Sequence, residues 1–165
     1  VMHFLYKKDE NVINLYIISN MASGLKLEDA VLNQYESCFK KTKSKLVGMV
    51  FKIAKEGNKE CIVIDKTFNR EGFTHDAFIE AFPTTEGRIG LLKYSGSTDD
   101  GRPLEKVILI LWAPMSSKAV QRMQYSSCFG TVKDELSGVD FHIQCSDIAD
   151  ISAEKIEAEV KSKCK

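Results

Sequence analysis

The stretch VILILW, residues 107–112, consists of six consecutive apolar residues and ends in the single tryptophan of the chain. A strand that packs on one face alternates apolar and polar side chains, whereas an unbroken apolar run is typical of a strand covered on both faces. Pro114 follows the run closely and marks a break. We therefore expect residues 107–112 to form the central strand of a sheet that lies between helices.

The elements on both sides of this run follow from periodicity and from turn residues. Apolar residues three and four positions apart predict helices, short apolar runs predict strands, and glycine, asparagine and proline mark the breaks. These rules predict a helix over 25–45, strands over 46–53 and 60–65, a helix over 75–82, strands over 88–94 and 107–112, a helix from Pro114 to about 136, a strand over 141–145 and a helix over 152–163. This order predicts the α/β (α+β) class, with a central five-stranded mixed β-sheet sandwiched between α-helices.

The same periodicity assigns individual side chains. Cys38 falls on the apolar face of the first helix, so we expect it to be buried. His75 begins the short helix and is expected to face solvent, whereas His142 lies in a strand and is expected to be structural. Ser152 is the expected N-cap of the last helix. Residues 95–103 are polar and contain two glycines, which predicts a loop.

Composition bounds the class of protein. The chain has 165 residues, which fits one domain, and its 23 basic residues balance 23 acidic residues. A zero net charge argues against bulk nucleic-acid binding, which needs an overall basic field. No stretch approaches the roughly 20 apolar residues of a membrane span. The number of cysteines is odd and no pair has metal-site or redox spacing, which favours reduced thiols and an intracellular compartment.

The first twenty residues differ in character from the residues that follow them. The apolar run within residues 1–20 is short and lacks a clear cleavage site, so it does not fit a secretory signal. Met21-Ala22-Ser23-Gly24 has the character of a true beginning. We expect residues 1–20 to be an N-terminal extension outside the fold, residues 21–165 to form the single domain, and the working protein to start at Met21.

Enzymatic motifs are absent from the sequence. None of the three histidines has metalloprotease spacing, there is no glycine-rich phosphate loop, and the oxygen ladder of an EF-hand is missing. We therefore expect a binding module that is not an enzyme and needs no cofactor or metal. Catalytic residues also assemble from distant positions, so a small hydrolase or transferase stays open as an alternative.

Two segments around the start of the long helix carry a family resemblance. Trp112-Ala113-Pro114, followed by Arg122-Met123-Gln124-Tyr125-Ser126-Ser127, resembles the long-helix signature of the actin-depolymerising factor (ADF) and cofilin family. Further landmarks occur in the family's order, and they are the segments 21–24, 77–83, 105–112 and 136–139. The resemblance runs from Met21 to about Lys163, so the chain is similar to a single ADF-homology domain.

The resemblance implies a function. It implies a monomer that binds actin monomers and the sides of actin filaments and promotes filament severing and depolymerisation in the cytoplasm. It also implies phosphorylation at Ser23, which would add negative charge to a terminus that must meet acidic actin. Phosphoinositide head groups are implied as competitors for the basic surface. The basic run 40–45 fits either a nuclear import signal or the positive end of a helix.

Residues of the long helix support an actin contact. Lys118 and Arg122 lie four apart and share one helical face, and Met123 beside them offers an adaptable apolar contact. The alternative is a solvated basic face with Met123 in the core. Taken residue by residue, the resemblance implies actin contacts at Ser23, Gly24, Lys118, Arg122, Met123, Ser127, Lys106, Arg102 and Lys155.

The sequence also departs from the family pattern. Val120 and Leu104 stand where basic residues are common, and Phe129 and Gly130 stand where the family prefers lysine and aspartate. These departures keep open a member that binds actin, or an actin-related complex, without efficient severing, as glia maturation factor does. Filament binding is accordingly a weaker expectation than monomer binding.

Overall fold

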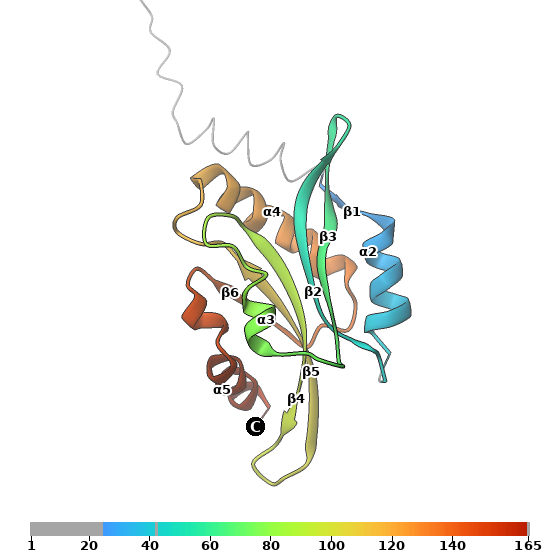
Figure 1. The fold of residues 1–165 in the computed structure, drawn as a ribbon, viewed down its shortest axis with the longest axis vertical. Coiled ribbons are helices and arrows are strands. Elements are labelled where there is room, and N and C mark those ends of the chain that lie inside the picture. Colours follow the sequence, from blue (N-terminus) through green and yellow to red (C-terminus); the bar gives the residue numbers. More distant parts are fainter. Residues whose placement is uncertain (1–24, 42, 165) are drawn as a thin grey trace, which may run out of the picture.

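The protein folds around one six-stranded sheet with the strand order β1-β3-β2-β4-β5-β6 (Figure 1). The computed structural model describes residues 25–41 and 43–164, so the expected extension over residues 1–20 lies outside the described residues. The strands are β1 (Lys26–Leu27), β2 (Leu46–Glu56), β3 (Lys59–Asn69), β4 (Arg88–Ser97), β5 (Pro103–Trp112) and β6 (Phe141–Cys145). Neighbours from β3 to β5 pair antiparallel, while the two outer strands pair parallel, which confirms a mixed sheet.

Helices cover both faces of the sheet (Figure 1). They are α2 (Asp29–Gln34), which continues as a π-helical turn over Tyr35–Phe39, α3 (His75–Ile79), α4 (Ala119–Glu135), a 3-10 turn over Ile148–Ile151, and α5 (Ala153–Lys163). One hydrophobic cluster joins α2 and α4 to the sheet, and a second joins α3 and α5 to the opposite face. The predicted class is therefore confirmed.

Strand β5 lies in the interior of the fold, as its apolar run predicts. Ile108 and Ile110 pack into the cluster beneath α3 and α5. Leu109 and Leu111 pack into the cluster beneath α2 and α4. The side chains of Ile108 to Trp112 are at most 3% exposed, so this strand supplies the middle of both cores.

The first helix differs from the expectation. Residues expected to open it form the short strand β1 instead, because Lys26 and Leu27 pair in parallel with Cys61 and Ile62 of β3. This pairing gives a sixth strand where five were expected. The helical part then ends at Phe39, whose carbonyl accepts a hydrogen bond of 2.5 Å from the buried Nζ of Lys93.

Two side-chain predictions are wrong. Cys38 is exposed, because it lies in the π-helical turn, where Tyr35 and Phe39 take the inward positions. His75 does not face solvent freely, since its Nε2 lies 2.6 Å from the carbonyl oxygen of Ile151 and its side chain is half-buried. The expected cap of α5 is confirmed, because the Ser152 side chain accepts a hydrogen bond from the Lys155 backbone N–H.

The hairpin of β4 and β5 is longer than expected. The strands continue to Ser97 and resume at Pro103, which leaves only a short turn in which Gly101 has a φ of +82°. The strand ends were hidden because their side chains are polar and exposed. This hairpin projects beyond the ends of β2 and β3 (Figure 1).

Helix α4 begins five residues later than Pro114. Pro114 opens a turn instead, in which the backbone N–H of Ser117 donates to the Pro114 carbonyl at 3.0 Å. Lys118 follows in an extended conformation and is the N-cap residue of the helix. The turn over 114–117 is therefore a separate element before α4, with Met115 and Ser116 exposed and Pro114 and Ser117 buried.

Two of the cysteines lie in the core of the fold. Cys128 and Cys145 are buried, and burial raises the pKa of each thiol to about 12, so both behave as small apolar side chains. Within the described residues, no helix combines the length and apolar character needed to cross a bilayer. The same residues contain no cluster of side chains suited to a metal ion.

Candidate functional site

An exposed surface surrounds the beginning of α4. Met115 is 73% exposed and Val120 is 61% exposed, and these are the large hydrophobic side chains that stand out on the described surface. The exposed Lys118 lies between them in the sequence. Apolar side chains scattered singly on a surface are normal, but two highly exposed ones within six residues, with a cation between them in the sequence, are suited to a protein partner. We call Met115, Lys118, Val120, Arg122, Met123 and Ser127 the α4 surface.

The side chain of Arg122 holds the turn over 114–117 against the first turns of α4. Its Nη1 donates hydrogen bonds to the carbonyl of Met115 at 3.1 Å and to the carbonyl of Ser117. The side chain is therefore half-buried against the turn over 114–117 instead of fully extended into solvent. The backbone N–H of Arg122 donates to the Lys118 carbonyl at 3.0 Å, so the two residues follow one another along the start of α4. Lys118 makes no ion pair with a described residue, whereas the Arg122 side chain holds the turn.

The outer stripe of α4 follows helical spacing. Val120, Met123 and Ser127 are three and four positions apart, so they lie along one face. Met123 and Ser127 are partly exposed, and Met123 belongs to neither hydrophobic cluster. Of the two sequence interpretations, the one that places Met123 in the core is therefore wrong.

Hydrogen bonds from the inner face of α4 anchor it to β2, to β3 and to the residue before β4. The hydroxyl of Tyr125 accepts a hydrogen bond from the backbone N–H of Ile53 in β2. The Gln121 side-chain oxygen accepts one from the Gly87 N–H just before β4, and the Gln124 amide donates to Glu60 of β3 at 2.6 Å. Sequence reasoning missed both glutamines, since a glutamine on a helix carries no signal for its partner.

The residues that depart from the family pattern on α4 lie in different environments, some buried and some exposed. Phe129 is buried within the α2–α4 cluster and packs edge-on against the ring of His142, with 6.0 Å between centroids. Gly130 is exposed, and a side chain at its position would meet open space. Phe129 is thus a core residue, while Val120 adds an apolar side chain to the α4 surface.

A second surface lies at the far end of the sheet. Arg102, near the tip of the β4–β5 hairpin, is highly exposed, and its Nε lies 2.7 Å from a carboxylate oxygen of Asp100. It lines one pocket together with Leu104 and Lys161 of α5. Lys106, further along β5, pairs with Asp140 at 3.0 Å, and the hydrogen bond that it donates to this carboxylate raises the pKa of Lys106.

The remaining sequence-predicted residues lie elsewhere. Lys155 is exposed on α5 but lines a different pocket, with Asp150 and Glu159. Within the described residues Lys161, not Lys155, shares a pocket with Arg102. Ser23 and Gly24 lie outside the described residues. The adjoining Leu25–Leu27 segment is described, and it meets β3 beside Glu60, the partner of α4.

A comparison with protein families decides the class. A profile described as "Cofilin/tropomyosin-type actin-binding protein" matches residues 24–161. The chain belongs to this family. The family is one of actin-binding proteins, and the expected ADF/cofilin resemblance is confirmed.

Individual relatives agree with this membership. The chain is 27% identical to actin-depolymerizing factor 6 of Oryza sativa over 141 residues, covering 86% of this chain and 98% of the relative. It is 29% identical to actophorin of Entamoeba histolytica over 140 residues, covering 85% and 97%. The crystal structure of Streptomyces griseoflavus cofilin matches the fold with a TM-score of 0.74 at 24% identity, covering 84% of this chain and 98% of that one.

Proposed function

We propose that this family member binds actin monomers and filament sides, and that the α4 surface is the principal contact. The observation that carries the proposal is that Met115 and Val120 are highly exposed on either side of Lys118 in the sequence, where the turn over 114–117 meets a helix anchored to β2, β3 and the residue before β4. A rigid apolar pair loses little conformational freedom on binding. Neighbouring cations favour an acidic partner surface, and such contacts weaken as salt is added.

Filament binding needs a second contact, which we assign to Arg102, Lys106 and the C-terminal part of α5. Arg102 lies in the turn of the β4–β5 hairpin and Lys106 four residues further along, whereas α4 follows the opposite end of β5. From Pro103 to Trp112 the strand spans about 30 Å. Two surfaces this far apart can engage different parts of a filament, which supports severing and depolymerisation as the finer function. Lys155 remains an expected contributor.

Regulation is proposed at the N-terminus. Ser23 stands two residues before the Leu25–Leu27 segment in the sequence, and that segment meets β3 beside Glu60, so phosphorylation of Ser23 would add negative charge to the chain just ahead of this contact. Phosphoinositide head groups would compete for the same basic surfaces. We expect a monomer in the cytoplasm, associated with the actin cytoskeleton, and the basic run 40–45 would favour nuclear import as well.

The alternative within the family is actin binding without efficient severing. Phe129 and Val120 favour it, because apolar side chains replace charges that the family pattern places on the long helix. Imaging of filament length distinguishes the two functions. The hydrolase or transferase alternative has less support, since the thiols of Cys128 and Cys145 are buried and protonated.

The test measures binding and shortening separately. Full-length protein is titrated against labelled monomeric actin by fluorescence, co-sedimented with filaments, and imaged on single filaments. The variant Lys118→Glu with Val120→Ser should weaken monomer binding by about tenfold or more. Lys55→Glu with Asn58→Ser, on the exposed β2–β3 turn, is the matched control and should bind normally. Unchanged affinity of the α4 variant, or no binding by the parent protein, would overturn the proposal.

A further inference from the structure

The β4–β5 hairpin leaves one edge of β4 without a strand partner. Strand β2 pairs with β4 only from Phe51↔Ile89 to Gly48↔Leu92. Strand β5 continues to pair with β4 as far as Ser97↔Pro103. Within the described part of the chain, residues 93–97 of β4 therefore have a strand on one side only. Such an edge presents free backbone N–H and C=O groups to any extended chain.

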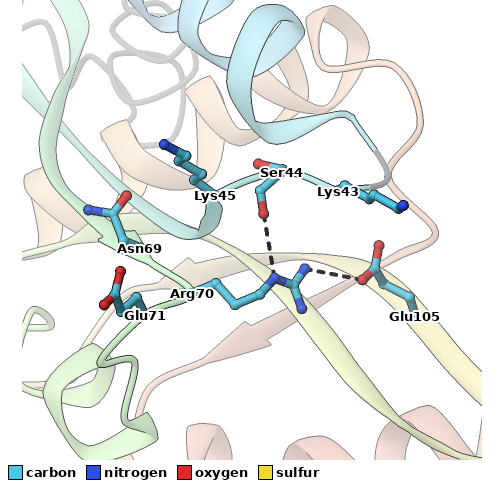
Figure 2. A pocket seen from close by; sticks show the side chains of 7 residues that line it. All are labelled: Lys43, Ser44, Lys45, Asn69, Arg70, Glu71 and Glu105. Atoms are coloured by element: carbon cyan, nitrogen blue, oxygen red, sulfur yellow. Dashed lines mark hydrogen bonds and ion pairs between the residues drawn. The ribbon is translucent and has the colours of Figure 1, made fainter.

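The face of this edge that lies toward α2 carries positive charge. An open cleft of about 870 Å³ is lined by Lys43 and Lys45, by Arg70 at the end of β3, and by Glu71 and Glu105. Figure 2 shows Arg70 reaching toward Glu105 beneath the loop that carries both lysines. Arg70 Nη2 lies 3.3 Å from the Glu105 carboxylate.

The charge balance of the cleft favours an acidic ligand. Lys43 and Lys45 are exposed and make no ion pair with any described residue. Glu105 is already occupied, because it contacts Arg70 and lies 3.9 Å from the Nζ of Lys93. Glu71 is the acid that opposes an incoming carboxylate, so its removal should strengthen binding.

The opposite face of the same edge is largely apolar. A second pocket of about 300 Å³ has an apolar part formed by Val47, Phe73, Leu92 and Tyr94; His75, Lys93 and Ser95 also line it, and it shares Arg70 with the charged cleft. Leu92 and Tyr94 pack with the α3–α5 cluster, whereas the intervening Lys93 reaches Phe39 on the other face. The second pocket is therefore lined by the β4 edge itself, and the charged cleft adjoins it through Arg70.

We propose that residues 94–97 of β4, which follow the buried Lys93, accept an extended peptide as an added strand, and that the preferred peptide alternates acidic and apolar residues. Successive side chains of a strand point to opposite faces, so alternate residues would meet the cations on one side and the apolar pocket on the other. Backbone hydrogen bonds supply affinity in this mode, and the alternation supplies specificity. The site lies near Ser95, whereas α4 follows Trp112 at the other end of β5, so it is separate from the α4 surface.

The test uses two labelled peptides of the same composition and the full chain. Fluorescence anisotropy compares a peptide that repeats Asp-Val-Glu-Val with one in which the acids and valines are segregated into blocks. The alternating peptide should bind at least about fivefold more tightly, and hydrogen exchange should show new protection within residues 94–97. Equal binding of the two peptides, no binding, or binding without that protection would overturn the proposal.

Variants of the cleft sharpen the result. Lys43→Glu with Lys45→Glu should weaken binding of the alternating peptide about tenfold, since two attractive contacts become repulsive. Glu71→Gln should strengthen it. The matched control, Lys55→Glu with Lys59→Glu, makes the same charge change on the exposed β2–β3 turn and should have no effect beyond a general salt-dependent shift. A control variant that weakens binding as much as the cleft variant would contradict the assignment.

Discussion

The phenol oxygen of Tyr125 lies 3.1 Å from the backbone nitrogen of Ile53 and accepts its hydrogen bond. This contact joins the buried face of α4 to strand β2 across 72 positions of sequence. Burial raises the pKa of Tyr125, so the hydroxyl stays protonated throughout the physiological range. The orientation of α4, and with it the α4 surface, depends on this buried residue.

Replacing Tyr125 by phenylalanine tests that dependence. The ring is retained, but the backbone N–H of Ile53 loses its acceptor, so the free energy of unfolding should fall by about 1–2 kcal/mol. Urea unfolding measures the change. A variant as stable as the parent would show that water replaces the hydroxyl at this position.

Replacing Gly87 by alanine should be more disruptive. An added methyl group would overlap the ring of Tyr125, and extra volume in a packed region costs about 1–3 kcal/mol. Gly130→Ala is the matched control, because its side chain would meet open space in a helix interior. The control should gain up to about 1 kcal/mol in thermal unfolding. Similar effects of the two substitutions would contradict the packing account.

Replacing Arg122 should lower the free energy of unfolding more than replacing Lys118. Arg122→Ala removes the hydrogen bonds to the Met115 and Ser117 carbonyls and should lower the free energy of unfolding by about 1–2 kcal/mol. Lys118→Ala removes an exposed side chain and should change it by less than about 0.5 kcal/mol. Both should weaken actin binding. Equal stability of the two variants would remove the clamp role of Arg122.

Much of this fold follows from the sequence, for physical reasons that differ between elements. Strand β5 was predictable because burial on both faces requires an uninterrupted apolar run. The start of α4 was not, because Pro114 suits a turn as well as a first helical residue. Strand β1 depends on pairing with the distant Cys61 and Ile62, for which two residues carry no local signal.

The candidate site divides in the same way. Lys118, Arg122 and Met123 were predicted from helical spacing and family resemblance; all three are at least partly exposed at the start of α4, and their contact with actin stays a prediction. The clamp formed by Arg122 was not predicted, since it depends on the turn over 114–117. On α5, charges repeat every few residues, so the sequence alone did not identify Lys161 as the neighbour of Arg102.

The stability of the fold should depend on pH through Asp65. Desolvation raises the pKa of this carboxyl, but hydrogen bonds from Lys52 and Arg88 outweigh it and lower the pKa below its usual 3.8. The carboxylate therefore stabilises the fold above that usual value, and the contribution disappears as the pH falls through the lowered pKa. Asp65→Asn should lose stability at pH 7, and the difference from the parent should shrink towards pH 3. A difference that stays constant in urea unfolding across this range would contradict the ion-pair account.

The second surface should matter for filaments more than for monomers. Arg102→Ala with Lys161→Ala removes the two cations that share one pocket and should weaken co-sedimentation with filaments severalfold. Monomer binding through the α4 surface should change little. The comparison variant is Lys155→Ala, which lies in another pocket and should have the smaller effect. Equal losses for monomers and filaments would place Arg102 and Lys161 in a single shared contact.

The burial of β5 on both faces determines which positions of the chain tolerate substitution. From Ile108 to Trp112 neither side of the ribbon touches solvent, so a library that randomises each codon should return almost only apolar residues there. Positions such as Lys118, Val120 and Gly130 carry no such restriction. Substitutions at exposed positions can therefore change which partner the protein binds, while the buried strand β5 keeps its sequence character and the fold.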